Sequence, residues 1–268
     1  MIDFIGEYPF QKSLIFDSHA HYDDLRFESV KEQLFDSLKN SGVAGIITCG
    51  CDPDSNLVAQ SLAESHDFMC FAAGIHPGNV DCLEEISLDN ALKQLREISK
   101  HKKCVGIGEI GLDYYWTQDN IDLQKTVFAK QLALANEVNL PVIVHDRDAH
   151  ADTLEFLKKY KPKGVVHSFS SSCEMAEEIY KLGMYIGISG VITFKNARKL
   201  PEVVANMPLD RFLLETDAPY LTPVPYRSKI NHSAMIYWSA QKIAEIRGIS
   251  TEKVLEHALE NTKKLYNI

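Results

Sequence analysis

Histidine and carboxylate side chains recur in this sequence directly after short apolar runs, a position from which several of them could act on one ligand. The first run leads into Asp17-Ser18-His19-Ala20-His21. Later runs lead into His76, Glu109, His145, His167 and Asp217. Imidazole nitrogen and carboxylate oxygen bind divalent cations such as zinc, manganese and magnesium. These residue types therefore indicate a metal site, provided that the fold brings them to one place.

The number of these groups indicates two metal ions rather than one. His19 and His21 are two residues apart, so their side chains share one face of a strand. Asp17 falls on the same face, where we expect it to accept a ring N–H from a histidine and to fix its tautomer. The candidate ligands are His19, His21, Glu109, His145, His167 and Asp217. They are too many for one tetrahedral ion with an open position, so we expect two divalent cations with a carboxylate bridging them.

Eight short apolar runs alternate with longer stretches of helical periodicity. The expected strands are 14–18, 45–50, 68–75, 104–109, 141–145, 164–167, 184–189 and 212–216. The expected helices include 28–40, 83–100, 122–139, 149–160, 233–247 and 251–265. Near-continuously apolar strands are typical of a parallel sheet that is buried on both faces. The pattern predicts an α/β fold, a single (β/α)8 TIM-type barrel, whose catalytic residues lie at the carboxyl ends of the strands.

The alternative is a doubly wound open sheet, which usually carries a phosphate-binding loop. The segment Gly106-Ile107-Gly108-Glu109-Ile110-Gly111 matches the spacing of such a loop. However, a carboxylate stands where a pyrophosphate should approach, and no helix is expected directly after it. The residue about twenty positions further on is Gln131 rather than an acid. We therefore favour the barrel and expect no nucleotide cofactor.

Length and composition are those of an ordinary globular protein. The chain has 268 residues, of which 45% are hydrophobic and 24% charged. No apolar run reaches the roughly 18 residues that span a bilayer, and the first residues do not have the pattern of a secretory signal. We expect one barrel domain over residues 1–268, with 1–12 as a short extension, no membrane contact and a cytoplasmic location. The six cysteines include no C-x-x-C pair and are expected to be reduced core residues.

The net charge of −9 argues against broad attraction to phosphate backbones or anionic lipids. Several basic residues nevertheless follow the late strands, near the expected mouth of the barrel. They are Arg147, Lys195, Arg198, Arg227 and Lys229. Their clustering on that side favours an anionic substrate.

The motifs in this order resemble the signature blocks of the TatD family of metal-dependent deoxyribonucleases, in the amidohydrolase superfamily. Besides the Asp17–His21 block, they are Gly74-Ile75-His76-Pro77, Gly108-Glu109-Ile110-Gly111-Leu112-Asp113-Tyr114, Val144-His145-Asp146-Arg147-Asp148-Ala149, His167-Ser168-Phe169-Ser170 and Leu214-Glu215-Thr216-Asp217-Ala218-Pro219-Tyr220-Leu221. The resemblance implies a TIM-type barrel with two divalent cations, foremost Mg with Zn or Mn as alternatives. It also implies hydrolysis of DNA from the 3′ end, with single-stranded DNA as the expected substrate and a monomer as the expected state.

The resemblance also implies roles for individual residues. His19, His21 and Asp217 would hold one metal, His145 and His167 would hold the other, and Glu109 would bridge the two. Asp217 would accept the proton of the attacking water. His76, Arg147 and Arg227 would contact the substrate phosphate.

The sequence departs from the family pattern after the eighth strand. In the block Arg227-Ser228-Lys229-Ile230-Asn231-His232-Ser233, a familiar glutamate is replaced by His232. No expected metal ligand is lost, so the departure bears on substrate preference. Two further functions stay open: a metal-dependent ester or amide hydrolase, such as a D-aminoacyl-tRNA deacylase, and a non-enzymatic barrel with structural metals. Tyr114 and Tyr115 either stack on a terminal base or pack on the rim of the barrel.

Overall fold

A computed structural model describes residues 9–84, 86–116 and 118–268. In this part of the chain, eight parallel strands follow one another in sequence order within one sheet. They are β1 (Ile15–Ala20), β2 (Val43–Cys49), β3 (Met69–Ala73), β4 (Cys104–Asp113), β5 (Val142–Arg147), β6 (Gly164–Val166), β7 (Tyr185–Ile188) and β8 (Phe212–Leu214). Ala20 at the end of β1 forms a parallel bridge with Ala218 after β8. The sheet therefore closes on itself, which confirms the TIM-type barrel and excludes the open sheet.

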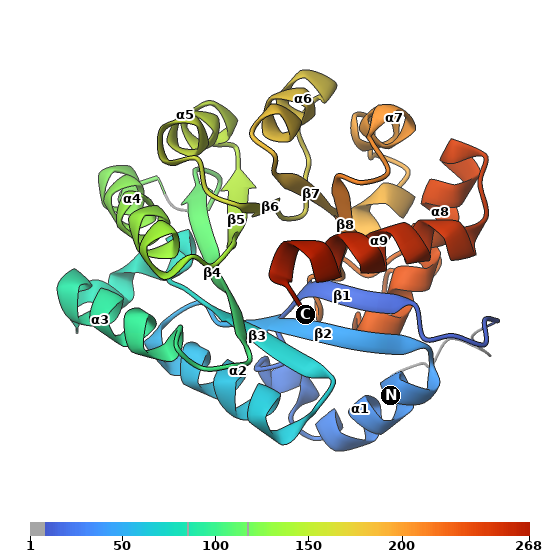
Figure 1. Cartoon of the computed structure of the whole chain (residues 1–268), viewed down its shortest axis with the longest axis horizontal. Helices are drawn as coiled ribbons and strands as arrows, with labels where there is room; N and C mark the ends of the chain where they lie inside the picture. Colours follow the sequence, from blue (N-terminus) through green and yellow to red (C-terminus); the bar gives the residue numbers. More distant parts are fainter. Residues whose placement is uncertain (1–8, 85, 117) are drawn as a thin grey trace.

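Helices follow most of the strands and lie around the outside of the barrel (Figure 1). They are α1 (Lys31–Asn40), α2 (Pro53–Ser65), α3 (Leu88–Ile98), α4 (Ile121–Val138), α5 (His150–Tyr160), α6 (Cys173–Lys181), α7 (Leu200–Asn206), α8 (Ile236–Arg247) and α9 (Thr251–Tyr266). Four short 3-10 helices complete the described part: η1 (Leu25–Phe27), η2 (Pro77–Glu84), η3 (Gly190–Thr193) and η4 (Ser233–Met235). No helix in the described ranges is long and apolar enough to cross a membrane.

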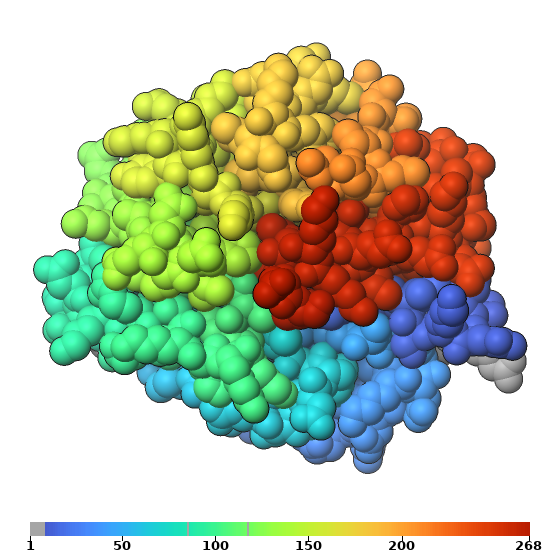
Figure 2. Space-filling view, in the orientation of Figure 1, coloured from blue at the N-terminus to red at the C-terminus, as the bar shows by residue number. Residues whose placement is uncertain are grey.

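Apolar side chains fill the inside of the barrel at its amino end. This cluster contains Phe16, Ile47, Cys49, Ala72, Val105, Ile143, Val165, Tyr185, Leu213 and Tyr266. Tyr266 comes from α9, which covers the end of the barrel that faces the viewer (Figure 2). A second and larger cluster packs the outer face of the strands against the helices. Because the amino end is filled with apolar groups, polar residues can gather only at the opposite end, the mouth.

Most element boundaries differ from the expected ones by one to three residues, and three elements differ more strongly. The strand expected over 104–109 continues to Asp113, because it pairs with β5 as far as Arg147. The helix expected over 83–100 begins only at Leu88, where the Ser87 side chain accepts a hydrogen bond from the backbone N–H of Asn90 and caps the helix. The helix expected over 233–247 is split into η4 and α8. Residues 1–8 of the expected N-terminal extension lie outside the described residues.

Candidate metal centre

The carboxyl ends of the strands surround a cavity of about 450 Å3. Five predicted ligands line it: His21, Glu109, His145, His167 and Asp217. The sixth, His19, is fully buried, and its Nε2 lies 3.0 Å from Nε2 of His21. The structure thus brings all six candidate ligands together at the mouth of the barrel.

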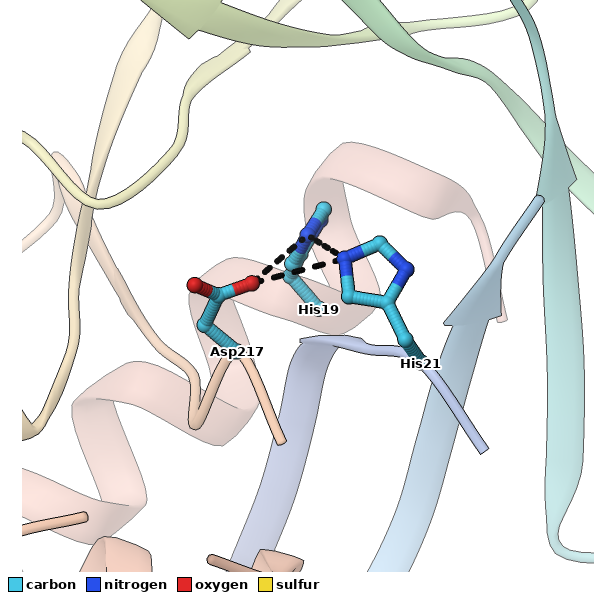
Figure 3. A group of neighbouring side chains, drawn as sticks. All are labelled: His19, His21 and Asp217. Carbon is cyan, nitrogen blue, oxygen red and sulfur yellow. Dashed lines mark hydrogen bonds and ion pairs between the residues drawn. The ribbon is translucent and has the colours of Figure 1, made fainter. Parts of the chain in front are cut away.

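His19, His21 and Asp217 form one group of ligand atoms (Figure 3). Nε2 of each histidine lies 3.4 Å from Oδ1 of Asp217. The two histidines come from the carboxyl end of β1, and Asp217 comes from the segment after β8. The backbone of Asp217 is left-handed, with φ of 58°. Residues other than glycine seldom adopt this conformation, and those that do gather at functional sites.

Glu109 joins this group to a second one. Its Oε2 lies 3.3 Å from Nε2 of both His19 and His21. Its Oε1 lies 2.7 Å from Nε2 of His167 and 2.8 Å from Nδ1 of His145. These last two nitrogens are 3.3 Å apart. One carboxylate therefore faces two pairs of histidine nitrogens, one pair with each oxygen, as a bridging ligand would.

The spacing of these atoms fits a bound cation. Ligand atoms about 2.1 Å from a tetrahedral zinc ion lie about 3.4 Å from one another. Among His19, His21, Glu109 and Asp217, the ligand atoms are 3.0, 3.3 and 3.4 Å apart. Two imidazole nitrogens that face each other at 3.0 Å can share only one proton between them, whereas a cation accepts both lone pairs. The donor set therefore suits divalent cations, with Glu109 common to both groups.

The ionised carboxylate of Glu109 requires compensating positive charge nearby. Burial disfavours the ionised form of Glu109, but the positive field of the surrounding imidazoles outweighs this and holds its pKa well below the ordinary value. Burial likewise disfavours the charged ring of His167, but Glu109 raises the pKa of this histidine to about 9. The carboxylates thus stay ionised and gather compensating positive charge, which divalent cations also provide.

His76 lies in the same cavity, where its ring forms a further group of possible ligand atoms with Glu109 and His145, but it was predicted as a substrate contact. Its Nδ1 accepts a hydrogen bond of 2.9 Å from the backbone N–H of Gly78. Burial lowers the pKa of His76 to about 3, so the ring is neutral and carries its proton on Nε2. This Nε2 lies 3.5 Å from Oε1 of Glu109. A neutral ring with its proton directed into the cavity is a hydrogen-bond donor, and its contact to substrate stays a prediction.

Asp113 and Glu215 were not predicted as part of the site. Their carboxylates face the ring nitrogens of His145 and His167 that point away from Glu109. Oδ2 of Asp113 lies 3.0 Å from Nε2 of His145. Oε1 of Glu215 lies 3.4 Å from Nδ1 of His167. Glu215 fits there because residue 187 is glycine: a Cβ at Gly187 would lie 2.3 Å from Oε2 of the glutamate. Carboxylates in this position fix the orientation of a ligand histidine and strengthen it as a ligand.

The prediction that Asp17 fixes the tautomer of a histidine ring is wrong. Oδ1 of Asp17 accepts from the backbone N–H of Thr216 at 2.9 Å, and Oδ2 accepts from the Thr216 hydroxyl at 2.6 Å. Oδ2 also accepts from the hydroxyl of Ser233 at 2.7 Å. Burial, opposed by these hydrogen bonds, raises the pKa of Asp17 to about 6. Asp17 therefore joins β1 to the segment after β8 rather than orienting a ligand.

Two cysteines on the neighbouring strand and loop touch the same histidines. Sγ of Cys49 lies 3.3 Å from Nδ1 of His19, and its backbone oxygen lies 3.1 Å from Nδ1 of His21. Sγ of Cys51 lies 3.7 Å from Nδ1 of His21. Cys49 fills the barrel interior as expected of a small residue, but it also contacts a ligand. The sequence contained a signal for this contact: Cys49 and Cys51 are two residues apart at the end of β2, and His19 and His21 have the same spacing on the adjacent strand β1.

The predicted phosphate-binding residues divide into two kinds. Arg147 is exposed and lines the cavity. Arg227 is not among the lining residues: its guanidinium lies over the ring of Phe194, with 3.8 Å to the centroid, and donates to the backbone oxygen of Thr222. The Arg227 side chain is thus bound to Phe194 and to the loop after β8. It does not reach the cavity that contains the candidate ligands. His232 is fully buried and belongs to none of the candidate ligand groups found in the described residues.

Comparisons with known proteins agree with this centre. The family model for TatD related DNase matches residues 16–267. YabD of Bacillus subtilis, described as an uncharacterized metal-dependent hydrolase, is 40% identical over 95% of this chain and 100% of its own length. YcfH of Escherichia coli, described in the same words, is 35% identical over 94% of this chain and 95% of its own length. The solved structure of YjjV, a TatD homologue from Escherichia coli, has a TM-score of 0.88 and 32% identity, covering 96% of this chain and 99% of YjjV. The chain therefore belongs to the TatD family of metal-dependent hydrolases.

Proposed function

We propose that this protein is a deoxyribonuclease that hydrolyses DNA phosphodiester bonds with two divalent cations, as a 3′–5′ exonuclease on single-stranded DNA. The observation that carries the proposal is Glu109, whose two oxygens face two separate pairs of histidine nitrogens. Two cations, when bound there, supply Lewis acidity toward a phosphodiester and a water molecule. The matching family model for TatD related DNase supports DNA as the substrate class.

The residues of the chain have distinct tasks in this reaction. His19, His21 and Asp217 would hold one cation, His145 and His167 would hold the other, and Glu109 would be shared by both. Asp217 is also the base that accepts the proton of the attacking water, since it is ionised and its side chain is 17% exposed toward the cavity. His76 and Arg147 donate hydrogen bonds to the phosphate oxygens, where negative charge increases in the transition state.

A second candidate function uses the same centre on a carbonyl carbon. Two cations and a carboxylate base serve ester and amide hydrolysis as well as phosphodiester hydrolysis. A D-aminoacyl-tRNA deacylase would need the same six ligands, so substrate assays have to separate the two candidates.

The test is a digestion time course on single-stranded DNA labelled at either the 3′ or the 5′ end. Protein stripped with EDTA is assayed after addition of Mg, Mn or Zn, beside Glu109→Gln and a matched control, Glu155→Gln on the exposed face of α5. We expect nucleotides to be released from the 3′ end only with metal, and at least about 100-fold more slowly in Glu109→Gln. Folded, metal-loaded protein that spares DNA but deacylates D-aminoacyl-tRNA would refute the nuclease and establish the second candidate.

A further inference from the structure

Two exposed aromatic side chains stand on opposite sides of the metal centre. Trp116 follows β4 and is 71% exposed, and Tyr220 follows β8 and is 48% exposed. Both line the cavity that contains the candidate ligands. In a closed barrel of eight strands, β4 and β8 lie across the mouth from each other. The metal ligands therefore occupy the space between the two rings.

The side chain of Trp116 is not packed into the hydrophobic core. Its ring meets the edge of Tyr115, with 4.7 Å between the centroids, and Arg147 lies 5.6 Å from its centroid. Nearly three quarters of the residue is left to solvent. Exposed aromatic rings at the rim of a polar cavity are typical of binding surfaces, because they offer a large flat contact area at a low cost in side-chain entropy.

An arginine accompanies each ring, and the two arginines differ. Arg147 lies 4.5 Å from the centroid of Tyr115, and no ion pair or hydrogen bond holds its guanidinium among the described residues. Arg26 lies 4.3 Å from the centroid of Tyr220 but is paired with both oxygens of Asp24, at 2.8 and 2.7 Å. The Trp116 side therefore offers unused donors to an anion, whereas the positive charge on the Tyr220 side is already neutralised.

A stacking surface is suited to a nucleotide when it lies beside a guanidinium that has no ion pair or hydrogen bond within the described residues. Bases of a single strand stack on aromatic rings regardless of sequence, and arginine binds the phosphates between them. Bases in a duplex already stack on each other and cannot insert against such rings. Tyr114 does not contribute, because it is half-buried and its hydroxyl donates to Asp152.

We propose that Trp116 and Tyr220 are two nucleobase-stacking platforms, and that Arg147 binds the phosphate next to the base on Trp116. This inference rests on the proposed nuclease function and deepens it: the substrate is single-stranded DNA, bound with one unstacked base on each side of the metal centre. The cavity of about 450 Å3 lies within the range of small-ligand sites, so it takes a nucleotide rather than a helix.

Tryptophan fluorescence tests the first platform directly. The chain has two tryptophans, so in a Trp238→Phe background Trp116 is the only one. A short single-stranded oligonucleotide with phosphorothioate linkages is titrated into the metal-loaded protein. We expect the emission to be quenched by this oligonucleotide, and not by an abasic one of the same length and charge. Equal quenching by both, or by neither, would overturn the platform at Trp116.

Affinities test both platforms. We expect Trp116→Leu and Tyr220→Leu each to weaken binding of the phosphorothioate strand by about 5- to 150-fold, the range of base–aromatic stacking. The control Leu57→Ala removes an apolar side chain that is 58% exposed on α2, and should bind normally. Unchanged affinity in both aromatic variants would overturn the proposal even if the enzyme cleaves DNA. Base-dependent quenching in a protein that cleaves no DNA would support the platforms and refute the nuclease, so the two failures are distinguishable.

Discussion

Two of the candidate ligand histidines, His145 and His167, face a further carboxylate at the ring edge that points away from Glu109. Asp113 lies behind His145, and Glu215 lies behind His167. Glu215 also accepts from the backbone N–H of Ser168, which holds the glutamate in place. The His145 ring is held at both edges and is therefore pre-organised, so metal binding does not have to immobilise it.

Replacing Asp113 with asparagine tests this orientation. Because the amide oxygen is needed by the backbone N–H groups of Tyr115 and Trp116, asparagine turns its NH2 group toward Nε2 of His145 and removes the charge that strengthens the ring as a ligand. We expect metal affinity to fall by about 10- to 100-fold, measured by competition with a chromophoric chelator. Asp122→Asn, a change on the exposed surface of α4, is the control. Equal affinities of the Asp113 variant and the wild type would contradict the role assigned to Asp113.

The contact between Cys49 and His19 is also expected to support metal binding. The sulfur of Cys49 lies against Nδ1 of His19, and alanine in its place removes that contact while leaving the backbone contact to His21. We expect Cys49→Ala to weaken metal binding by about 10-fold, and Cys49→Ser, which restores an acceptor, to recover part of the loss. Cys70→Ala, on β3 and away from the histidines, is the control in the same chelator assay. A serine variant no better than alanine would show that the sulfur fills space and nothing more.

The positions of the candidate ligands could be predicted from the sequence, and those of most of the residues that contact them could not. Parallel strands in register bring their carboxyl ends to one mouth, so the position of His145 or Glu109 follows from the order of the elements alone. Whether a neighbouring carboxylate points at a ligand histidine depends on which other hydrogen-bond donors surround that carboxylate. Asp17 has the right spacing from His19, but three donors on Thr216 and Ser233 bind its carboxylate instead.

At the scale of elements, strands were easier to predict than the loops that carry function. The apolar runs are buried on both faces and have one periodicity, whereas η2 and η4 arise from local turns that resemble the start of the next helix. The path of the segment after β4 was likewise not predictable from the sequence. This segment carries Trp116, and its path depends on hydrogen bonds from the backbone N–H groups of Tyr115 and Trp116 to Asp113.

A second anchor holds this segment to the outer helices. Asp152 on α5 accepts from the hydroxyl of Tyr114 at 2.6 Å and pairs with Lys125 on α4 at 2.7 Å. Hydrogen bonds from these two groups lower the pKa of Asp152. An acid with a lowered folded-state pKa stabilises the fold above its ordinary pKa, and this contribution is lost as the pH falls through the folded-state value.

We therefore expect Asp152→Asn to lower the free energy of unfolding at pH 7 by about 1 kcal/mol, a value reduced for the partial exposure of the pair. The deficit should shrink as the pH falls below the ordinary aspartate pKa, about 3.9. Urea unfolding at a series of pH values measures it, with Glu155→Gln on the same helix as the control. A deficit that does not change with pH would mean that the charge of Asp152 contributes nothing.

At the scale of the whole molecule, the barrel has one weak seam. Neighbouring strands from β1 to β8 are joined by ladders of two or more residue pairs, whereas in the described residues a single β-bridge, between Ala20 and Ala218, joins β1 to the segment after β8. Backbone bonds from Asp217 to His19 at 3.0 Å and from His21 to Ala218 at 2.7 Å supplement it. The candidate ligands His19, His21 and Asp217 lie on both sides of this seam, so a cation held by all three would join its two edges.

Metal removal should therefore loosen the closure of the barrel as well as abolish catalysis. A cation that binds only the folded state stabilises it by about 2.7 kcal/mol at 100 times its dissociation constant. In a chain of this size, that corresponds to a rise in melting temperature of about 5 to 10 °C over EDTA-treated protein. Glu109→Gln lacks the shared ligand and should show a much smaller rise. Hydrogen exchange locates the effect: the amides of His21 and Asp217 should exchange more slowly with metal, while those within the β2–β3 ladder should not change. Uniform slowing across all strands would place the stabilisation in the barrel as a whole, and would contradict a cation acting across the seam.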